Sequence, residues 1–286
     1  MYKILTDVAS DISYNLALEY DIDVLQMNLT IDQDEYCHTV DYQNLSFEEF
    51  YNRISNGSTC KTSQINPGLY YEYFKEHAEK GLDILYICLS AALSNSYNSA
   101  MLAKEMIEND FDSKVLVVDS ISAGPAEALL AILASNNRNK GTDIDKNYEL
   151  MNSIKNNINL YFTLNDLSFL VNGGRLSKSQ AFIGSTLKLK PIISVDSEGK
   201  VVKSATIRSS KGAIKKLLAL MEERIINHQI NTIILINTRS DVYSLLKEKV
   251  KEKFSNFNII ELNVGPFVGC HIGDSACGVC FIGKNR

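Results

Sequence analysis

The chain has 286 residues, of which 45% are hydrophobic and 22% are charged, and its formal net charge is −5. This length is long for one hydrophobic core and suits two domains, while the composition excludes a disordered or fibrous chain. The mildly acidic total charge indicates no nucleic-acid partner.

Charge is distributed unevenly between the two halves of the chain. Residues 1–150 carry 10 Lys and Arg against 24 Asp and Glu, a balance of −14. Residues 151–286 carry 19 against 10, a balance of +9. This asymmetry favours two domains with different partners, although ordinary solvated faces could give the same counts.

Targeting signals are not evident in the sequence. Thr6 and Asp7 interrupt the first apolar run, so no signal-peptide core is present. The most apolar stretch, 126–134, is far shorter than the roughly 20 residues that a membrane-spanning helix needs. The six cysteines are too few and too scattered for a disulfide framework. We therefore expect a protein of the reducing cytoplasm without stable membrane insertion.

The first half alternates short apolar runs with helical patterns. Strands are predicted over residues 2–5, 84–89 and 115–118, and helices over 14–20, 69–80, 95–108 and 125–138. Strands that alternate with helices predict βαβ units and a parallel sheet. Residues 30–60, which are acidic and less regular, are interpreted as a surface excursion with one helix at 46–55.

The second half has a different pattern, in which a hairpin is predicted over 191–205 with Gly199 in its turn. Short helices are expected at 166–171 and near Ser177, longer helices at 210–227 and 241–254, and strands at 233–236, 259–264 and 276–282. This pattern predicts an α+β layer domain. The fold class is therefore a two-domain α/β protein, with an N-terminal parallel-sheet domain at 1–160, an α+β domain at 161–286, and the boundary near 155–165.

Two segments place hydroxyl groups where strands end and helices begin. Thr62 and Ser63 precede a Pro-Gly turn and a predicted helix, and Ser94 follows the predicted strand 84–89. In a parallel sheet, ligands bind beyond the carboxyl ends of the strands, where helix N-termini offer free N–H groups to anions. The same residues would also serve as plain helix caps, which is the commoner use.

Two further segments combine glycine with one charged or titratable side chain. Four of the residues in 265–273 are Gly or Pro, so the backbone is tightly shaped around His271. Arg175 follows Gly173 and Gly174 on a predicted turn. An arginine held in this way suits a carboxylate or a phosphate, or a salt bridge to the acidic half.

Together these segments resemble the DegV family of bacterial fatty-acid-binding proteins. No one motif decides the match, but six occur in the right order over nearly the whole chain. They are Thr62-Ser63-Gln64 with Pro67, the Leu-Ser-x-x-Leu-Ser-x-x-Tyr of 89–97, Val118-Asp119-Ser120 with Gly124, Gly173-Gly174-Arg175-Leu176-Ser177, Lys190-Pro191-Ile192, and Gly265-Pro266-x-x-Gly-x-His271-x-Gly273.

The resemblance implies a long-chain fatty acid, such as palmitate, in a tunnel between two α/β domains. It also implies service as the acyl-binding subunit of fatty acid kinase, in which a separate ATP-binding subunit phosphorylates the bound carboxyl group and the acyl phosphate supplies phospholipid synthesis. The family's carboxylate-binding Thr and Ser correspond to Thr62 and Ser94, and its nearby Arg and His to Arg175 and His271. Ser63, beside Thr62, is expected to take part in ligand binding.

The sequence departs from the family in two loops. Ala92 and Asn95 stand where the family often has glycine, and residues 273–278 differ from its usual Gly-Pro-Gly-Ala-Leu-Gly. These changes leave the head-group donors in place. They put in doubt the shape of the tunnel near the loop, and with it the preferred chain length.

The chain also lacks a motif for binding ATP, which agrees with the carrier role that the resemblance implies. A carboxylate needs ATP for activation, and the sequence has no phosphate-binding G-x-x-x-x-G-K-[ST] loop. We therefore expect a carrier without a cofactor or metal rather than an enzyme, served by an external kinase subunit. Arg208, Lys211 and Lys215 flank the start of one exposed helix and are candidates for its docking face, unless they are ordinary solvated charges.

Three alternatives remain open from the sequence. A serine hydrolase would use Ser94 as nucleophile and His271 as base. The nucleophile elbow of such enzymes, however, has glycine at the positions that Ala92 and Ser96 occupy here. A metal or redox site would use Cys270, His271 and the pair Cys277 and Cys280. Because residues three apart on a strand point to opposite faces, that pair is interpreted as core residues. A regulatory or scaffolding protein with a dry interdomain cleft is the third alternative.

Overall fold

The computed structural model describes residues 1–181, 189–226 and 231–286. The first sheet is parallel throughout, as predicted. Its strands stand in the order β2 (Ile22–Leu25), β1 (Tyr2–Asp7), β6 (Asp83–Cys88) and β7 (Val115–Asp119). The strand β2, which the sequence analysis did not predict, follows the short helix α1 (Tyr14–Glu19) and completes a βαβ unit at the edge of the sheet.

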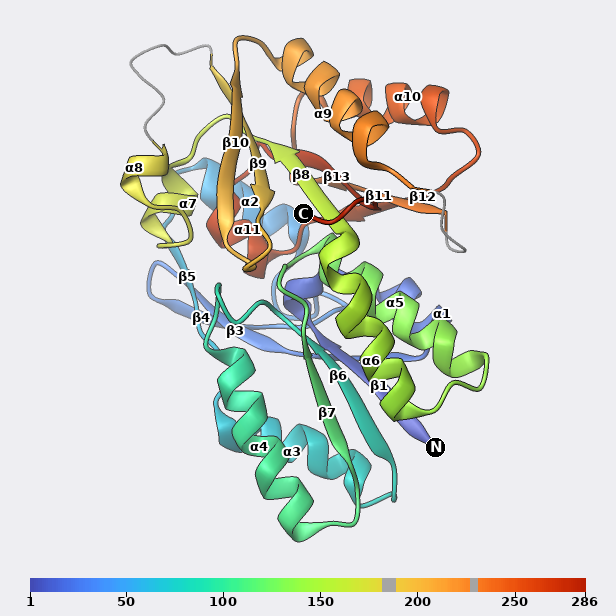
Figure 1. The fold of residues 1–286 in the computed structure, drawn as a ribbon. Coiled ribbons are helices and arrows are strands. Elements are labelled where there is room, and N and C mark those ends of the chain that lie inside the picture. Colours follow the sequence, from blue (N-terminus) through green and yellow to red (C-terminus); the bar gives the residue numbers. More distant parts are fainter. Residues whose placement is uncertain (182–188, 227–230) are drawn as a thin grey trace.

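Alternating side chains of the first sheet reach two different helical layers. Ile84 and Tyr86 of β6 pack toward α3 (Pro67–Ala78) and α4 (Ser96–Asp110). Leu85 and Ile87 pack on the other face, where α5 (Pro125–Asn139) and α6 (Ile144–Ile154) lie. Figure 1 shows the pair α3 and α4 at one side of this sheet and the pair α5 and α6 at the other. Because both faces are covered, the inner part of the sheet is apolar, and β6 and β7 are nearly continuous apolar runs.

The second sheet is mixed and lies above α5 and α6 in Figure 1. Its order is β10 (Val201–Ile207), β9 (Lys190–Val195), β8 (Ile158–Thr163), β13 (Cys277–Ile282), β11 (Thr232–Asn237) and β12 (Asn258–Asn263), and all neighbours except β11 and β12 are antiparallel. One face carries α9 (Ser210–Arg224) and α10 (Tyr243–Lys253). The predicted α+β layer arrangement is thereby confirmed. Residue 227, the end of the helix predicted over 210–227, lies outside the described residues.

Helix α5 connects the cores of the two sheets. Its side chains are buried on all sides, from Pro125 to Ser135, and it packs against β1 as well as β8 and β11. A helix that is apolar all round belongs inside a protein rather than on its surface. The chain passes from one sheet to the other after α6 through a 3-10 turn (Lys155–Asn157). The boundary predicted at residue 160 falls inside β8, and the division into 1–160 and 161–286 stays a prediction.

The hairpin of β9 and β10 also fastens the second sheet to the first. Gly199, in its turn as predicted, has φ +80, a left-handed conformation that favours glycine. Its carbonyl accepts a hydrogen bond of 3.1 Å from the Ser90 hydroxyl, just after β6. A Cβ at position 199 would lie 2.3 Å from that hydroxyl, so only glycine permits this approach.

The interpretation of residues 30–60 as an irregular excursion was wrong. They contribute to a third, antiparallel sheet in the order β4 (Asp34–His38), β3 (Met27–Ile31) and β5 (Cys60–Thr62), together with the predicted helix, α2 (Phe47–Ser55). Leu29 and Ile31 of β3 are buried against α2. The strands are short, and their acidic residues Asp34 and Glu35 are exposed, which is why composition alone suggested a surface loop.

The segment 265–273 is likewise a helix rather than a loop, and this corrects the interpretation of the glycine-rich pattern. Helix α11 (Pro266–Ile272) begins with Pro266 at its first position, where proline's missing N–H costs nothing. It packs against α7 (Ser168–Asn172), α2, β3 and β5. The short helices α7 and α8 (Lys178–Ala181) correspond to those predicted around residues 166–171 and Ser177.

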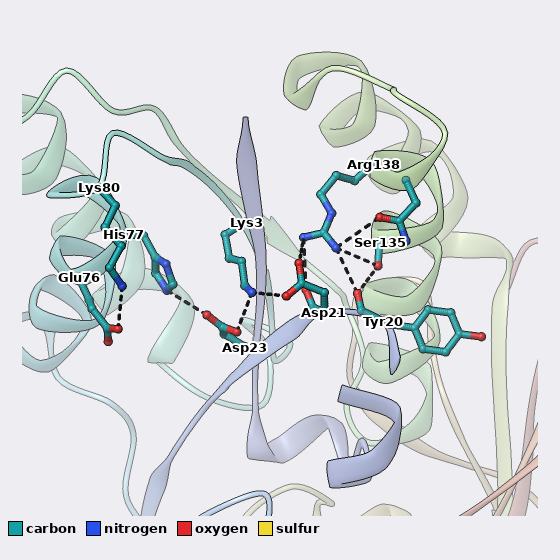
Figure 2. Close-up of polar contacts among 10 residues, drawn as sticks. Lys3, Tyr20, Asp21, Asp23, Glu76, His77, Lys80, Ser135 and Arg138 are labelled. Atoms are coloured by element: carbon teal, nitrogen blue, oxygen red, sulfur yellow. Dashed lines mark hydrogen bonds and ion pairs between the residues drawn. The ribbon is translucent and has the colours of Figure 1, made fainter. Parts of the chain in front are cut away.

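A polar network at the edge of the first sheet holds β2 against its helices. Figure 2 shows Lys3 between Asp21 and Asp23, with His77 of α3 on one side and Arg138 of α5 on the other. Lys3 Nζ lies 3.1 Å from Asp23 Oδ1, and Arg138 Nη1 lies 3.1 Å from Asp21 Oδ2. These contacts join α3, β1, β2 and α5, and because Asp21 and Asp23 are partly exposed each ion pair contributes only about 0.2–1 kcal/mol.

Candidate binding cavity and the DegV family

A cavity of about 430 Å³ is walled by the segments that follow β1, β6 and β7 of the first sheet and by strands of the second sheet. Its volume is within the range of small-molecule sites. One part of the wall is polar and contains Thr62, Ser94, Arg175 and His271, four of the five ligand-binding residues predicted from the sequence. The apolar part of the wall includes Leu160, Phe162, Val195, Val201, Ile236 and Val264.

Thr62 and His271 meet directly, although 209 positions separate them in the chain. Thr62 is the last residue of β5, His271 lies in α11, and Thr62 Oγ1 is 2.9 Å from His271 Nε2. Burial, and secondarily the positive charge of Arg175, lowers the pKa of His271 to about 4. The imidazole is therefore neutral at pH 7 and offers one donor and one acceptor.

The other ring nitrogen of His271 is buried and has no hydrogen-bond partner within residues 1–181, 189–226 and 231–286. Gly173, two residues before Arg175, explains how the ring fits. A Cβ at position 173 would lie 2.4 Å from His271 Nδ1 and 3.0 Å from the Phe169 carbonyl oxygen. The first glycine of the Gly173-Gly174-Arg175 motif thus makes room for the imidazole, a reason that the sequence alone does not reveal.

Arg175 carries the positive charge of the cavity wall. Its Nε donates to the Leu93 carbonyl at 3.1 Å, and its Nη1 donates to the Gly173 carbonyl at 2.5 Å. In the described part of the chain no carboxylate forms an ion pair with it. Its side chain is half-buried, and this burial lowers the pKa of the guanidinium. A partly desolvated cation without a counter-charge favours an anionic ligand.

Ser94 lies at the start of α4, as expected from its place after β6. Its hydroxyl accepts a hydrogen bond of 3.2 Å from the Ser96 N–H and lies 2.9 Å from the Ser96 hydroxyl. The cap residue itself, Asn95, makes no side-chain capping bond among the residues described. The positive end of a 15-residue helix therefore faces this side of the cavity, where it adds to the field of Arg175.

The remaining predicted residues lie outside the cavity wall. Ser63 is exposed, and its N–H donates to the Asn28 carbonyl at 2.9 Å, so the geometry gives no support to its predicted ligand contact. Arg208, directly after β10, is exposed, as are Lys211 and Lys215 in α9. None of these three cations forms an ion pair with another described residue. Their predicted role in docking a partner stays a prediction.

Sequence analysis missed Asp11 and Gln64, which also line the cavity. Asp11 is buried and accepts a 2.8 Å hydrogen bond from the N–H of Gly265, 254 positions away. Burial raises the pKa of its carboxyl well above the usual range. Its one local peculiarity, a φ of +56, comes from the backbone and leaves no mark in the sequence.

The structure lacks the arrangement that a serine hydrolase needs. The Ser94 hydroxyl bonds to Ser96, and His271 Nε2 bonds to Thr62, so no nucleophile–base hydrogen bond joins Ser94 and His271 among the described residues. In the same residues, no carboxylate contacts His271 Nδ1 to orient the ring. Both parts of the catalytic arrangement are therefore missing from this geometry.

The cysteine pair near the C-terminus is part of the core, as predicted. Cys277 packs with α9 and α10 on one face of the second sheet, whereas Cys280 packs on the other face with α5. No three His, Cys, Asp or Glu side chains of the described chain are grouped so that they could hold a metal ion. Over the same residues, no helix has the length and apolar character needed to cross a membrane.

Comparison with known proteins identifies the family. Residues 1–284 match the family model described as "Uncharacterised protein, DegV family". A DegV domain-containing protein of Clostridium perfringens is 32% identical over 287 residues, covering 100% of this chain and 98% of that protein. A DegV domain-containing protein of Streptococcus pyogenes serotype M1 is 31% identical, covering 99% of each. The chain belongs to the DegV family.

Solved DegV structures share the fold over the full length of the chain. "DegV, a fatty acid binding protein from Bacillus subtilis" matches with a TM-score of 0.84 at 25% identity, covering 99% of each chain. A Streptococcus agalactiae structure, titled as a fatty acid binding DegV family protein, matches with a TM-score of 0.87 at 23% identity, covering 100% of this chain and 99% of that one. Both of these DegV proteins are thus described as fatty-acid-binding proteins, and the α/β fold of this chain is the one that they share.

Proposed function

We propose that this DegV protein binds a long-chain fatty acid such as palmitate in its cavity. In this proposal it presents the carboxylate to a separate ATP-dependent kinase subunit. The protein itself acts as a carrier, and the acyl phosphate made by the kinase subunit supplies phospholipid synthesis. We infer that this transfer takes place in the cytoplasm, where ATP is available to the kinase subunit. The observation that carries the proposal is a cavity with one cationic, hydroxyl-lined part and an otherwise largely apolar wall.

The polar part of the cavity has the chemistry that a carboxylate requires. The hydroxyls of Thr62 and Ser94 are hydrogen-bond donors, and Arg175 supplies a positive charge with which no carboxylate of the described residues forms an ion pair. Hydrogen bonds to a charged group contribute about 1.5–3 kcal/mol each, more than those between neutral groups. His271, being neutral, adds no net charge but fixes the position of the Thr62 hydroxyl.

The apolar part of the cavity supplies most of the affinity. Each buried CH₂ group contributes about 0.8 kcal/mol, so a 16-carbon chain could contribute on the order of 10 kcal/mol. Phe162 and Ile236, which line the cavity and are buried in the protein, are two of the apolar side chains that the tail would contact. The DegV protein of B. subtilis, with 25% identity and the same fold, is described as a fatty acid binding protein, and this supports the proposed ligand class.

The kinase subunit must reach the head group, and we propose that it docks on the basic face around Arg208 and Lys211. Reversing both charges (Arg208→Glu, Lys211→Glu) is expected to lower acyl-phosphate formation from palmitate and ATP by roughly tenfold in a mixture with the kinase subunit. The reason is that complementary charges steer association. Palmitate affinity should not change, because neither residue lines the cavity.

A double reversal elsewhere in the second half is the matched control. Lys251 and Lys253 of α10 are also exposed, so K251E/K253E alters the net charge by the same amount. Acyl-phosphate formation should stay normal in this control. Equal rates in both double variants would contradict a docking site at Arg208 and Lys211 and leave the proposed fatty-acid binding unaffected.

A further inference from the structure

Two cysteines lie beside Thr62 and His271, two residues of the polar part of the cavity wall. Cys60 pairs with Ile31 of β3, and Thr62 pairs with Leu29. Residues directly opposite each other in an antiparallel sheet project to the same face. Leu29 and Ile31 are buried at 1% and 0% exposure, so Cys60 and Thr62 share the buried face of the third sheet.

Helix α11 packs against this same face and brings the second cysteine. Cys270 precedes His271, is 4% exposed, and belongs to the cluster that contains Leu29 and Ile31, against which Cys60 packs. Helix α11 contacts β5 directly, and burial, together with the neighbouring Cys60 thiol, raises the pKa of the Cys270 thiol. One strand and one helix thus carry both the thiol pair and the Thr62–His271 contact.

We propose that Cys60 and Cys270 form an oxidation site, in which hydrogen peroxide converts the two thiols into a disulfide beside the fatty-acid head group. Cys60 is only half-buried and is the thiol that peroxide can reach. One peroxide oxygen is transferred to Cys60 Sγ, which gives a sulfenic acid and water. Cys270 Sγ then attacks that sulfur, the S–S bond forms, and a second water leaves. Two thiols are oxidised by two electrons and one peroxide is reduced.

The disulfide should change the site because its geometry is restrictive. It requires an S–S distance of about 2.05 Å, which is much shorter than a contact between free thiols. Strand β5 and helix α11 must adjust to it, and they carry Thr62 and His271. We therefore expect the oxidised protein to bind palmitate about 5- to 150-fold more weakly, the usual range for coupled sites. This effect on palmitate rests on the proposed function, whereas disulfide formation does not.

The sequence contains a matched control thiol on the same sheet. Cys37 of β4 is also half-buried, but it pairs with Asn28, the neighbour of Leu29 on β3. Alternate residues of a strand point to opposite faces, so Cys37 projects away from α11. The variant Cys37→Ser should therefore behave like the wild type, whereas Cys60→Ser and Cys270→Ser should not form the cross-link.

The experiment treats the delipidated, folded protein with hydrogen peroxide, blocks the remaining thiols, digests the chain and identifies linked peptides by mass spectrometry. Palmitate affinity is measured before oxidation, after oxidation and after reduction with dithiothreitol. We expect a peptide that links positions 60 and 270 in the wild type and in C37S, none in C60S, and an affinity loss that dithiothreitol reverses. If C270S is unstable, C60S alone decides the comparison, because Cys60 is the less buried of the two.

The possible failures are distinguishable. Reduced protein that binds palmitate but forms no link between residues 60 and 270 would overturn this inference and leave the proposed function intact. A disulfide that leaves palmitate affinity unchanged would overturn the coupling to the site. A disulfide in a protein that never binds palmitate would contradict the proposed function while confirming the thiol pair.

Discussion

The double variant Thr62→Ala, Ser94→Ala is expected to bind palmitate at least about 100-fold more weakly than the wild type. Each hydroxyl that donates to the carboxylate contributes about 1.5–3 kcal/mol, and 1.4 kcal/mol corresponds to a factor of ten. Both hydroxyls line the cavity, and Thr62 also bonds to His271. Isothermal titration of the delipidated proteins measures the difference. A neutral ligand of similar length, hexadecanol, should lose much less affinity because it has no charge to stabilise.

Ser63→Ala is the matched control for this variant. Ser63 adjoins Thr62 but is exposed and lies outside the cavity wall, so its removal should leave palmitate affinity unchanged within about twofold. If palmitate affinity falls as far in S63A as in the double variant, the loss comes from a disturbed loop or fold. It does not then come from lost contacts in the cavity. That result would contradict the assignment of Thr62 and Ser94.

The second large effect is expected from Arg175→Met, which removes the charge but keeps much of the side-chain volume. Palmitate affinity should fall about 10- to 100-fold, as expected for the loss of a charge-assisted contact. The pKa of His271 should rise from about 4, because the positive charge of Arg175 is one of the two causes that lower it. Both changes are measurable, the first by titration with palmitate and the second by NMR of the imidazole against pH.

Arg138→Met is the control for a general effect of losing an arginine. Arg138 forms an ion pair with Asp21 at the edge of the first sheet and does not line the cavity, so this variant should bind palmitate normally. The His271 resonance should also titrate as in the wild type. A normal palmitate affinity in R175M would exclude Arg175 from the head-group site.

Much of the first sheet could be predicted because β6 and β7 are nearly continuous apolar runs. Ile84 to Cys88 is buried on both faces, and its apolar pattern is visible without knowledge of its neighbours. The opposite orientations of Cys277 and Cys280 followed from the two-residue period of a strand. These features depend on local pattern, which the sequence contains in full.

The features that were missed depend on distant partners. Strand β8 contains Asn159, whose buried amide donates to the Lys284 carbonyl at 2.9 Å, 125 positions away. Without that partner Asn159 interrupts the apolar pattern of residues 158–163, and the sequence analysis predicted no strand there. Similarly, residues 60–62 form a strand because β3 pairs with them, although three residues alone carry too little pattern to indicate one.

Some residues of the candidate site could be predicted from the sequence, and others could not. Thr62, Ser94, Arg175 and His271 could be named because each lies in a motif of the DegV family, and the structure brings all four to one cavity. The roles of Gly173 and Asp11 could not be derived, since the first depends on the His271 ring and the second on the Gly265 N–H. These contacts exist only after the third sheet and α11 have packed together.

The most direct test of the account is mass spectrometry of an organic extract of the protein, freshly purified from cells supplied with palmitate. The account predicts a long-chain fatty acid in the wild-type extract in about equimolar amount, and little in the extract of the T62A/S94A variant. A wild-type extract with no more fatty acid than that of the variant would contradict the claim that this cavity holds an anionic lipid.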